Sequence, residues 1–253
     1  MLGGILAIAK KECRVQLRYR VVWINMALTP FFMLAPWVLS AGMMSRELGE
    51  AVLVGSLTWY WLNQYFFGSQ EAFEEEREEG TLVSIALSPM SLMEFLIGKG
   101  LWIFVECAYI TAVTMLLFRL LGFERATSFE MLLLYLISGA YMFAFSILWG
   151  ALALRFRRIG GINFAVQETL GVVSGVTASV SAYPRVVRLV AYAVPLTYTI
   201  EIGRKVLTGA TFREIAPAVL ALTAVTALYL LLGWLTLGKA EEELRRKGEW
   251  EAW

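Results

Sequence analysis

Six long apolar stretches alternate with short polar or charged segments along the chain. They cover residues 21–43, 51–69, 96–118, 131–154, 162–182 and 215–237. A helix needs about 20 mostly apolar residues to cross a bilayer, and each stretch is long enough. The pattern therefore predicts an all-α, polytopic membrane protein, with residues 1–253 forming a single transmembrane domain of six spans.

Two further features concern proline and a short seventh segment. The first span carries Pro30 and Pro36, which a membrane helix tolerates where neighbouring helices satisfy the freed carbonyls. The apolar segment 189–200, "LVAYAVPLTYTI", is too short to cross and contains Pro195. Segments of this length are typically re-entrant or interfacial. We therefore expect residues 183–213 to form an outer re-entrant hairpin before span six.

The N-terminal segment, residues 1–20, has the pattern of a helix lying on the membrane. At helical spacing its basic residues share one face: Lys10, Lys11, Arg14 and Arg18. A basic amphipathic helix of this kind beds in the headgroup layer, although a plain juxtamembrane anchor fits equally well. Glu12 and Gln16 fall on the apolar face, which indicates a protein neighbour there.

Charge distribution predicts the orientation. Six spans place both termini on one side, and the segments on that side, including the tail 238–253, carry most of the Lys and Arg. The positive-inside rule then makes the termini cytoplasmic in the cell membrane of a prokaryote. The segment 183–213 is predicted to lie on the outer side, yet it carries several Lys and Arg residues, which the positive-inside rule does not favour there. A hairpin dipping back into the membrane would place them at the outer headgroups.

Composition narrows the function. Of 253 residues, 58% are hydrophobic, and the formal net charge of +1 argues against a nucleic-acid partner. The chain has no histidine and no aspartate, which removes His-based triads, His metal sites and Asp-based phosphoryl chemistry. Cys13 and Cys107 lack metal or redox spacing. We expect no catalytic residue and no metal site in this chain.

The loop after span two, residues 70–95, is unusual. An acidic run, "EAFEEEREE", leads to Gly80, a natural helix stop, and a short amphipathic piece ends at Pro89. Ser91 and Glu94 then match a capping box that starts the next helix. The pattern predicts a cytoplasmic elbow joined to two spans, with Leu82, Ile85 and Leu87 as candidate apolar contacts for a soluble partner.

Polar residues also occur inside the spans. Glu106, Gln167 and Glu168 are costly in lipid and should face protein or water. They either line a substrate route or pair with other polar groups of the chain. Small residues at helical spacing in span five form a ladder that allows close packing, against a second copy or another span of the same chain: Gly171, Gly175 and Ser179.

Three blocks of the sequence resemble the membrane subunit of type-two ATP-binding-cassette (ABC) exporters. They are "AIAKKECRVQLRYRVVWINMALTPFFML", "EEEREEGTLVSIALSPMSLMEFLIGKG" and "VPLTYTIEIGRKVLTG". The resemblance implies an ATPase-coupling helix carried by Gly80, Thr81, Leu82, Ser88, Pro89 and Lys99. It also implies a re-entrant hairpin matched by Pro195, Leu196, Glu201, Arg204 and Gly209. This chain departs from the pattern in lacking the proline that often precedes the pair Ser174-Gly175.

ATP would then be handled elsewhere, because the chain contains no G-x-x-x-x-G-K-[ST] loop. The resemblance implies a separate ABC ATPase, in two copies, that holds ATP and Mg, and a second permease copy forming a homodimer or a heterodimer. The substrate would be a drug, a lipid, a lipid-linked glycan or an ion. Two other hypotheses are a self-sufficient proton-coupled carrier using Glu106 and Glu168, and a membrane-embedded enzyme, which the missing His and Asp disfavour.

Overall fold

The structure is a computed structural model that describes residues 2–156 and 160–247. Within these ranges every regular element is helical. In chain order the elements are α1 (Leu2–Arg18), α2 (Arg20–Thr29), η1 (Pro30–Leu34), α3 (Ala35–Met44), α4 (Arg46–Glu78), α5 (Leu82–Leu87), α6 (Leu92–Leu120), α7 (Phe129–Phe156), α8 (Gly160–Val173), η2 (Val180–Ala182), α9 (Arg185–Ala191), α10 (Pro195–Leu207) and α11 (Phe212–Lys247). The predicted all-α class is confirmed.

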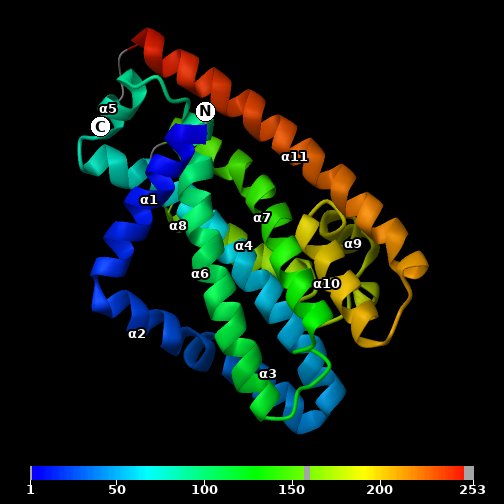
Figure 1. The fold of residues 1–253 in the computed structure, drawn as a ribbon. Coiled ribbons are helices and arrows are strands. Elements are labelled where there is room, and N and C mark those ends of the chain that lie inside the picture. The colour runs from blue at the N-terminus through cyan, green and yellow to red at the C-terminus, as the bar shows by residue number, and fades with distance from the viewer. Residues whose placement is uncertain (1, 157–159, 248–253) are drawn as a thin grey trace.

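Helix α4 forms the centre of the bundle, with α3, α6, α7 and α10 packed around it (Figure 1). Trp61 of α4 is fully buried and donates a hydrogen bond from Nε1 to Thr111 Oγ1 of α6, 3.0 Å away. Its ring also lies against Gly139 of α7, where any side chain would collide with it. Because α4 is surrounded by protein, it does not need a uniformly apolar surface.

Four helical segments are long and apolar enough to cross a membrane, and a bent pair raises the number to five. The four are Arg20–Met44, Leu92–Leu120, Phe129–Phe156 and Phe212–Arg246, which contain four of the six predicted spans. Span 51–69 lies within α4, whose apolar and polar residues are mixed. The described part of the chain thus supports a multi-pass membrane protein with four or five candidate spans. It does not establish the six spans predicted from the sequence.

The fifth predicted span, 162–182, is wrong as one continuous helix. Helix α8 ends at Val173, and Gly175 takes a φ of +85°, which only glycine adopts readily. The chain then passes directly over Gly55 of α4, where an added Cβ would lie 2.3 Å from the Val176 carbonyl oxygen. The break forms even though the proline that often precedes Ser174-Gly175 is absent.

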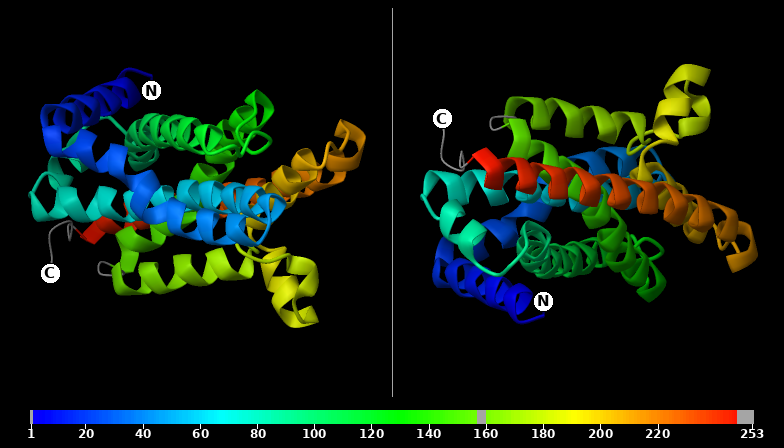
Figure 2. Two further views of the ribbon diagram at one scale, coloured as in Figure 1. Left: turned by 90° about the horizontal axis from the view of Figure 1, so that it is seen from below. Right: turned by 90° about the horizontal axis from the view of Figure 1, so that it is seen from above.

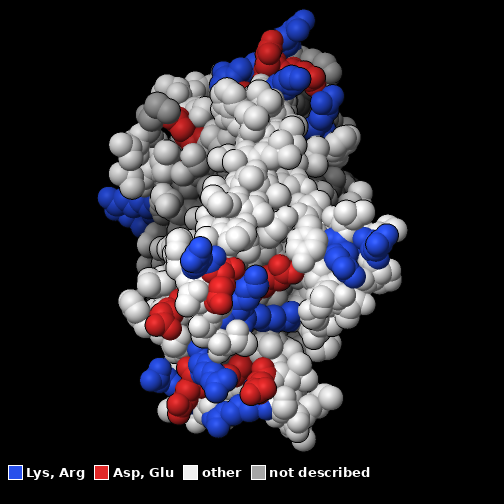
Figure 3. Space-filling model, turned by 90° about the vertical axis from the view of Figure 1, so that its right-hand side faces the viewer, with Lys and Arg blue, Asp and Glu red and all other residues white. Residues whose placement is uncertain are grey.

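The predicted tail also differs from the structure. Helix α11 continues without interruption to Lys247, so residues 238–247 extend the last span as helix. Residues 248–253 of that predicted tail lie outside the described residues. Between Glu214 and Lys239, α11 carries no charged side chain. On the right-hand side of the molecule as drawn in Figure 1, most charged groups lie near the top and in the lower half, and the middle of the surface between them is largely uncharged (Figure 3).

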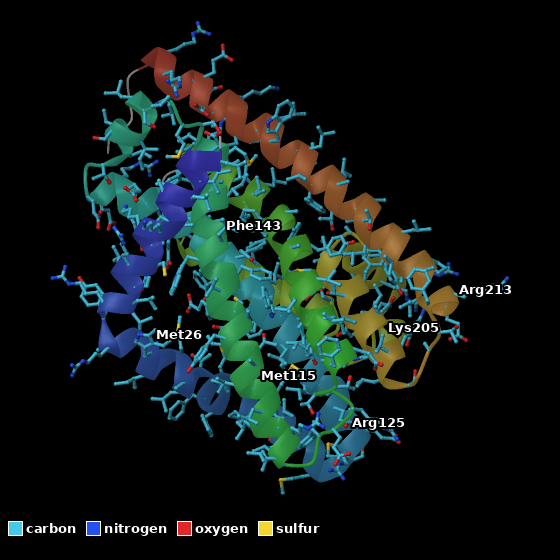
Figure 4. The ribbon with its side chains drawn as sticks, viewed as in Figure 1. Met26, Met115, Arg125, Phe143, Lys205 and Arg213 are labelled. Atoms are coloured by element: carbon cyan, nitrogen blue, oxygen red, sulfur yellow. The ribbon has the colours of Figure 1, made fainter. Side chains whose placement is uncertain are left out.

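Helices α9 and α10 form the bent pair, with an angle of 93° between them. Pro195 starts α10 in its first turn, where a proline ring is tolerated. This shape fits a broken span as well as the predicted re-entrant hairpin. Lys205 and Arg213 project near the junction of α10 and α11, away from α5, and Arg125 lies on the loop between α6 and α7 (Figure 4).

Candidate functional site

The segment that links α4 to α6 folds as the elbow expected for residues 70–95. Helix α4 ends at Glu78, and Gly80 follows with a φ of +69°. Thr81 then donates from Oγ1 to the Glu76 carbonyl oxygen and to the Glu76 carboxylate. The helix stop at Gly80 is confirmed, and a side chain anchors the turn that follows it.

A capping box starts α6, as predicted. The Ser91 hydroxyl accepts a hydrogen bond from the Glu94 backbone N–H at 3.2 Å, and the Glu94 carboxylate accepts one from the Ser91 N–H at 3.0 Å. On the other side of the break, Ser88 Oγ donates to the Ile85 carbonyl oxygen at 2.6 Å and closes the end of α5. With Pro89 between these two units, the direction of the elbow is fixed by local bonds.

The three side chains predicted to contact a partner, Leu82, Ile85 and Leu87, differ in how deeply they are buried. Leu82 is fully buried, in a cluster with Phe73 of α4 and Phe95 of α6. Ile85 packs half-buried against the same cluster, whereas Leu87 is 81% exposed. The prediction that Leu82 meets a partner is therefore wrong, because its side chain anchors α5 to the bundle. Leu87 is available for docking.

Helices α1, α6, α7 and α11 support the elbow together with α4. Leu237, Ala240 and Leu244 of α11 belong to the buried cluster beneath α5. Glu241 Oε2 accepts a hydrogen bond from the Leu92 N–H, 3.4 Å away, at the start of α6. Figure 1 shows α5, the start of α1 and the end of α11 gathered at one end of the molecule. Sequence reasoning missed this role of α11, which only the continuous helix reveals.

A network of ion pairs joins α1, α4 and α6 next to the elbow. Lys99 Nζ lies 3.1 Å from Glu12 Oε1 of α1 and 2.9 Å from Glu75 Oε2 of α4. Lys11 Nζ of α1 lies 2.6 Å from Glu76 Oε1. Glu12, predicted to face a protein neighbour, does so. Two glutamates of the acidic run, Glu75 and Glu76, are thus paired with lysines of the same chain and are not free to bind a partner.

Glu76 is the best-anchored acid of the run. Burial alone would raise its pKa, but hydrogen bonds from Lys11 and Thr81, together with the positive charges of Lys11 and Lys99, lower the pKa below its usual value. Its carboxylate therefore remains charged in the folded protein over a wider pH range than in the unfolded chain. The charge holds the elbow, α1 and α6 together.

Glu106 of α6 lines a polar cavity of about 110 Å³ between α1, α4 and α6. The cavity walls also include Gln16 and Glu12 of α1 and Gln64 of α4. Lys99 forms part of the wall as well, so this predicted coupling residue lies between the elbow and the cavity. Among the described residues, no group of three or more His, Cys or acidic side chains is placed to hold a metal ion.

Glu168 of α8 lines a different cavity of about 150 Å³. Trp37 of α3 and Trp59 of α4 form part of its wall, and Trp59 Nε1 donates to the Gln167 carbonyl oxygen at 3.4 Å. Gln167 itself points inward and is buried. Helices α1 and α8 lie on opposite sides of the central layer (Figure 2). Glu106 and Glu168 therefore do not share one cavity.

The predicted glycine ladder does not form a helical face. Gly171 lies in α8, Gly175 lies in the break and Ser179 precedes η2, so the spacing of four no longer places them in line. Gly171 instead accommodates Trp59 of the same chain, since a Cβ there would lie 2.6 Å from Trp59 Nε1. The small residue serves packing within the chain.

Arg204 of α10 stabilises the break. Its guanidinium donates from Nη2 to the Val176 carbonyl oxygen at 2.9 Å and from Nη1 to the Ala178 carbonyl oxygen at 3.3 Å. These carbonyls have left the helical ladder and would otherwise lack donors. Sequence resemblance had assigned Arg204 to the hairpin without giving it a partner. The structure connects that hairpin to the end of α8.

Comparison with protein families agrees with this architecture. Residues 25–235 match the family described as ABC-2 family transporter protein. The match covers most of the chain, from the first candidate span to the last, and the chain belongs to this family. It is a membrane-spanning transport subunit and not an enzyme by itself. No curated protein matches the chain.

Proposed function

We propose that this chain is the permease subunit of an ABC exporter, driven by a separate ATPase that docks on the elbow. The observation that carries the proposal is the combination of an exposed Leu87 with a buried Leu82 on one short helix. A docking element must present apolar surface to its partner and also be fixed to the spans it moves. Helix α5 meets both requirements.

The ion network supplies the mechanical link. A push on α5 would reach α4 through Thr81 and Glu76, and α6 through the elbow and Lys99. The same push would reach α1 through Lys11 and α11 through the shared apolar cluster. Packed interiors transmit such displacements because they resist compression. Nucleotide-driven motion of the ATPase would thereby move several spans together.

Further parts of the proposal follow from the family. Two ATPase subunits holding ATP and Mg, and a second permease copy, would complete the transporter. The elbow end, with α1 and the end of α11, would face the cytoplasm. The exposed acids of the run, including Glu78 and Glu79, would speed association with a basic partner surface. A proton relay between Glu106 and Glu168 gains no support, since the two line separate cavities.

The experiment compares two exposed leucines: Leu87, at the end of α5 before α6 begins, and Leu121, directly after α6 ends. Leu87→Asp places a charge on the proposed docking surface, and Leu121→Asp does the same on the loop away from it. A docked leucine contributes roughly 1.5–3 kcal/mol, so Leu87→Asp should weaken ATPase binding about tenfold or more. The permease is purified from its host with its bound ATPase, and retained ATPase is measured for each variant.

Leu121→Asp should retain the ATPase at the wild-type level. Both variants should elute from size exclusion like the wild type, because each replaced side chain is exposed. Normal ATPase retention and ATP-driven transport in Leu87→Asp would show that α5 is not the coupling element.

A further inference from the structure

The cavity lined by Glu106 carries more negative charge than the chain itself neutralises. Four glutamates face it from α1, α4 and α6, against a single lysine: Glu12, Glu71, Glu75, Glu106 and Lys99. Lys99 is already paired with Glu12 at 3.1 Å and with Glu75 at 2.9 Å. Glu71 and Glu106 form no ion pair with any described residue. Two carboxylates at one cavity without a cation are unfavourable close to lipid.

The other polar groups of the wall point to a ligand independently. Trp102 lines the cavity with only 8% of its surface exposed, and its indole N–H has no hydrogen-bond acceptor within the described chain. Gln16 and Gln64 line the same cavity and likewise bond to no described residue. Buried polar groups are normally paired, by protein or by a bound molecule. Trp102, nine-tenths buried with its indole N–H unpaired, therefore indicates an occupant, and the half-buried Gln16 and Gln64 offer that occupant further polar groups.

The wall also defines what kind of molecule fits. Phe67 and Trp102 supply aromatic rings, and Ile103 and Ala72 supply apolar surface beside the carboxylates. Aromatic faces attract organic ammonium groups, and carboxylates complement their charge. A bare metal ion would find no suitable group of ligands among the described side chains. The chemistry selects a cation that has an apolar part.

We propose that this cavity, between α1, α4 and α6, binds the ammonium group of an organic cation and is the point where substrate enters the transporter. The second half of this statement rests on the proposed exporter function; the binding itself does not. Lys99 joins the cavity to the ion network of the elbow. An arriving cation would compete with Lys99 for Glu12 and Glu75, and so report its presence to the docking element.

The test measures binding of benzyltrimethylammonium to the purified permease in neutral detergent, without the ATPase, by isothermal titration calorimetry. Wild type should bind saturably. Glu106→Gln and Glu71→Gln should each weaken binding about tenfold, since each removes one uncompensated charge. Glu47→Gln, which neutralises an exposed acid at the far end of α4, should bind like the wild type. The melting temperature of each variant is measured alongside.

The Glu71→Gln variant keeps the test decisive if Glu106→Gln unfolds, because Glu71 is exposed at the cavity rim. Two further measurements, in nanodiscs of different lipid composition, distinguish whether the bound ammonium group belongs to a lipid headgroup or to a free cation. In nanodiscs with phosphatidylethanolamine, weaker probe binding than in phosphatidylglycerol nanodiscs shows that a lipid headgroup occupies the cavity. Equal binding shows that it takes a free cation. Either result supports the site.

The proposal is overturned if wild type binds no probe in detergent or nanodiscs, or if Glu168→Gln removes binding while Glu106→Gln and Glu71→Gln do not. The latter result would place the cation in the cavity beside Trp37 and Trp59. Measuring how much ATPase stays bound to the permease separates the proposed exporter function from the proposed cation site. A permease that holds its ATPase but binds no ammonium leaves the exporter function standing and removes only the cation site.

Discussion

Lys99 of α6 lies 3.1 Å from Glu12 of α1, and both side chains are almost completely buried. This pair fastens the N-terminal helix to the bundle at a point where Gly98 leaves room for it. A Cβ on Gly98 would lie 2.6 Å from the Ile8 Cβ. Helix α1 is therefore bound to protein along one face, whatever its other face contacts.

Lys99→Met should strongly destabilise the protein. Removing one partner of a buried ion pair leaves the other charge uncompensated, at a cost of about 3–5 kcal/mol. Glu12 would retain only Lys11 at 4.0 Å. The thermal midpoint of the purified permease in detergent measures this loss.

Lys10→Met on α1 is the matched control, since the Lys10 side chain is exposed and water can replace it. Its effect should be clearly smaller. The double variant Lys99→Met with Glu12→Leu should regain stability relative to Lys99→Met alone, because the buried charge of Glu12 is removed together with that of Lys99 and the remaining partner, Glu75, is exposed to water. A double variant no better than the single one would mean that Glu12 and Lys99 are not coupled.

Leu82→Ala and Leu87→Ala should separate anchoring from docking. Leu82 is fully buried beneath α5, and replacing a buried leucine by alanine costs about 2–5 kcal/mol. Leu87→Ala removes an exposed side chain and should leave the melting temperature unchanged. Hydrogen exchange over residues 80–90 checks this: exchange should accelerate in Leu82→Ala only. Equal exchange in both variants would contradict the anchoring role.

Stability should depend on pH through Glu76. Its pKa is lowered from 4.5 in the folded protein, so folding favours the charged form. The stabilisation is complete above the unfolded pKa and is lost as pH falls through the folded pKa. Glu76→Gln should therefore melt below wild type at pH 7, and the difference should shrink below about pH 4.

Glu47→Gln serves as the control for this pH series, because Glu47 is an exposed acid in the first turn of α4. Its melting temperature should follow that of the wild type at every pH. If the difference between wild type and Glu76→Gln stays constant down to pH 3, the charge of Glu76 is not what stabilises the elbow.

Two glycines with positive φ test the break after α8. Gly175→Ala adds backbone strain and a Cβ 2.7 Å from the Ala178 carbonyl oxygen. Gly209→Ala adds strain alone, since nothing lies within 4 Å of its Cβ. Left-handed backbone costs a non-glycine residue roughly 1–2 kcal/mol. Gly175→Ala should therefore lower the melting temperature further than Gly209→Ala, and the reverse order would argue against the close turn.

Local signals in the sequence were sufficient for the elbow. Gly80, Pro89 and the Ser91–Glu94 pair each act within four residues, and the structure contains the expected helix stop and capping box. Hydropathy likewise located the long apolar helices. It failed at span five, because Gly175 and the donors of Arg204 permit a break in a segment that is long and apolar enough to be read as one span.

The site was less predictable, because burial depends on residues far apart in the chain. Nothing near Leu82 distinguishes it from Leu87, yet one is enclosed by Phe73 and Phe95 and the other is open. The partner of Glu12 is Lys99, 87 positions away along the chain, and only packing brings them together. Such pairings require the fold.

The last prediction concerns Pro89, which is exposed and separates α5 from α6. Pro89→Ala removes the fixed φ between two locally bonded units and leaves Leu87 in place. We expect the ATPase to bind normally but to hydrolyse ATP with about half the transport per ATP or less, because a loosened elbow absorbs part of the stroke. Reconstituted vesicles measure both rates. Glu241→Gln should have a similar but smaller effect, since it weakens the bond from α11 to the Leu92 N–H. Unchanged transport per ATP in Pro89→Ala would show that rigidity at this position is not needed for coupling.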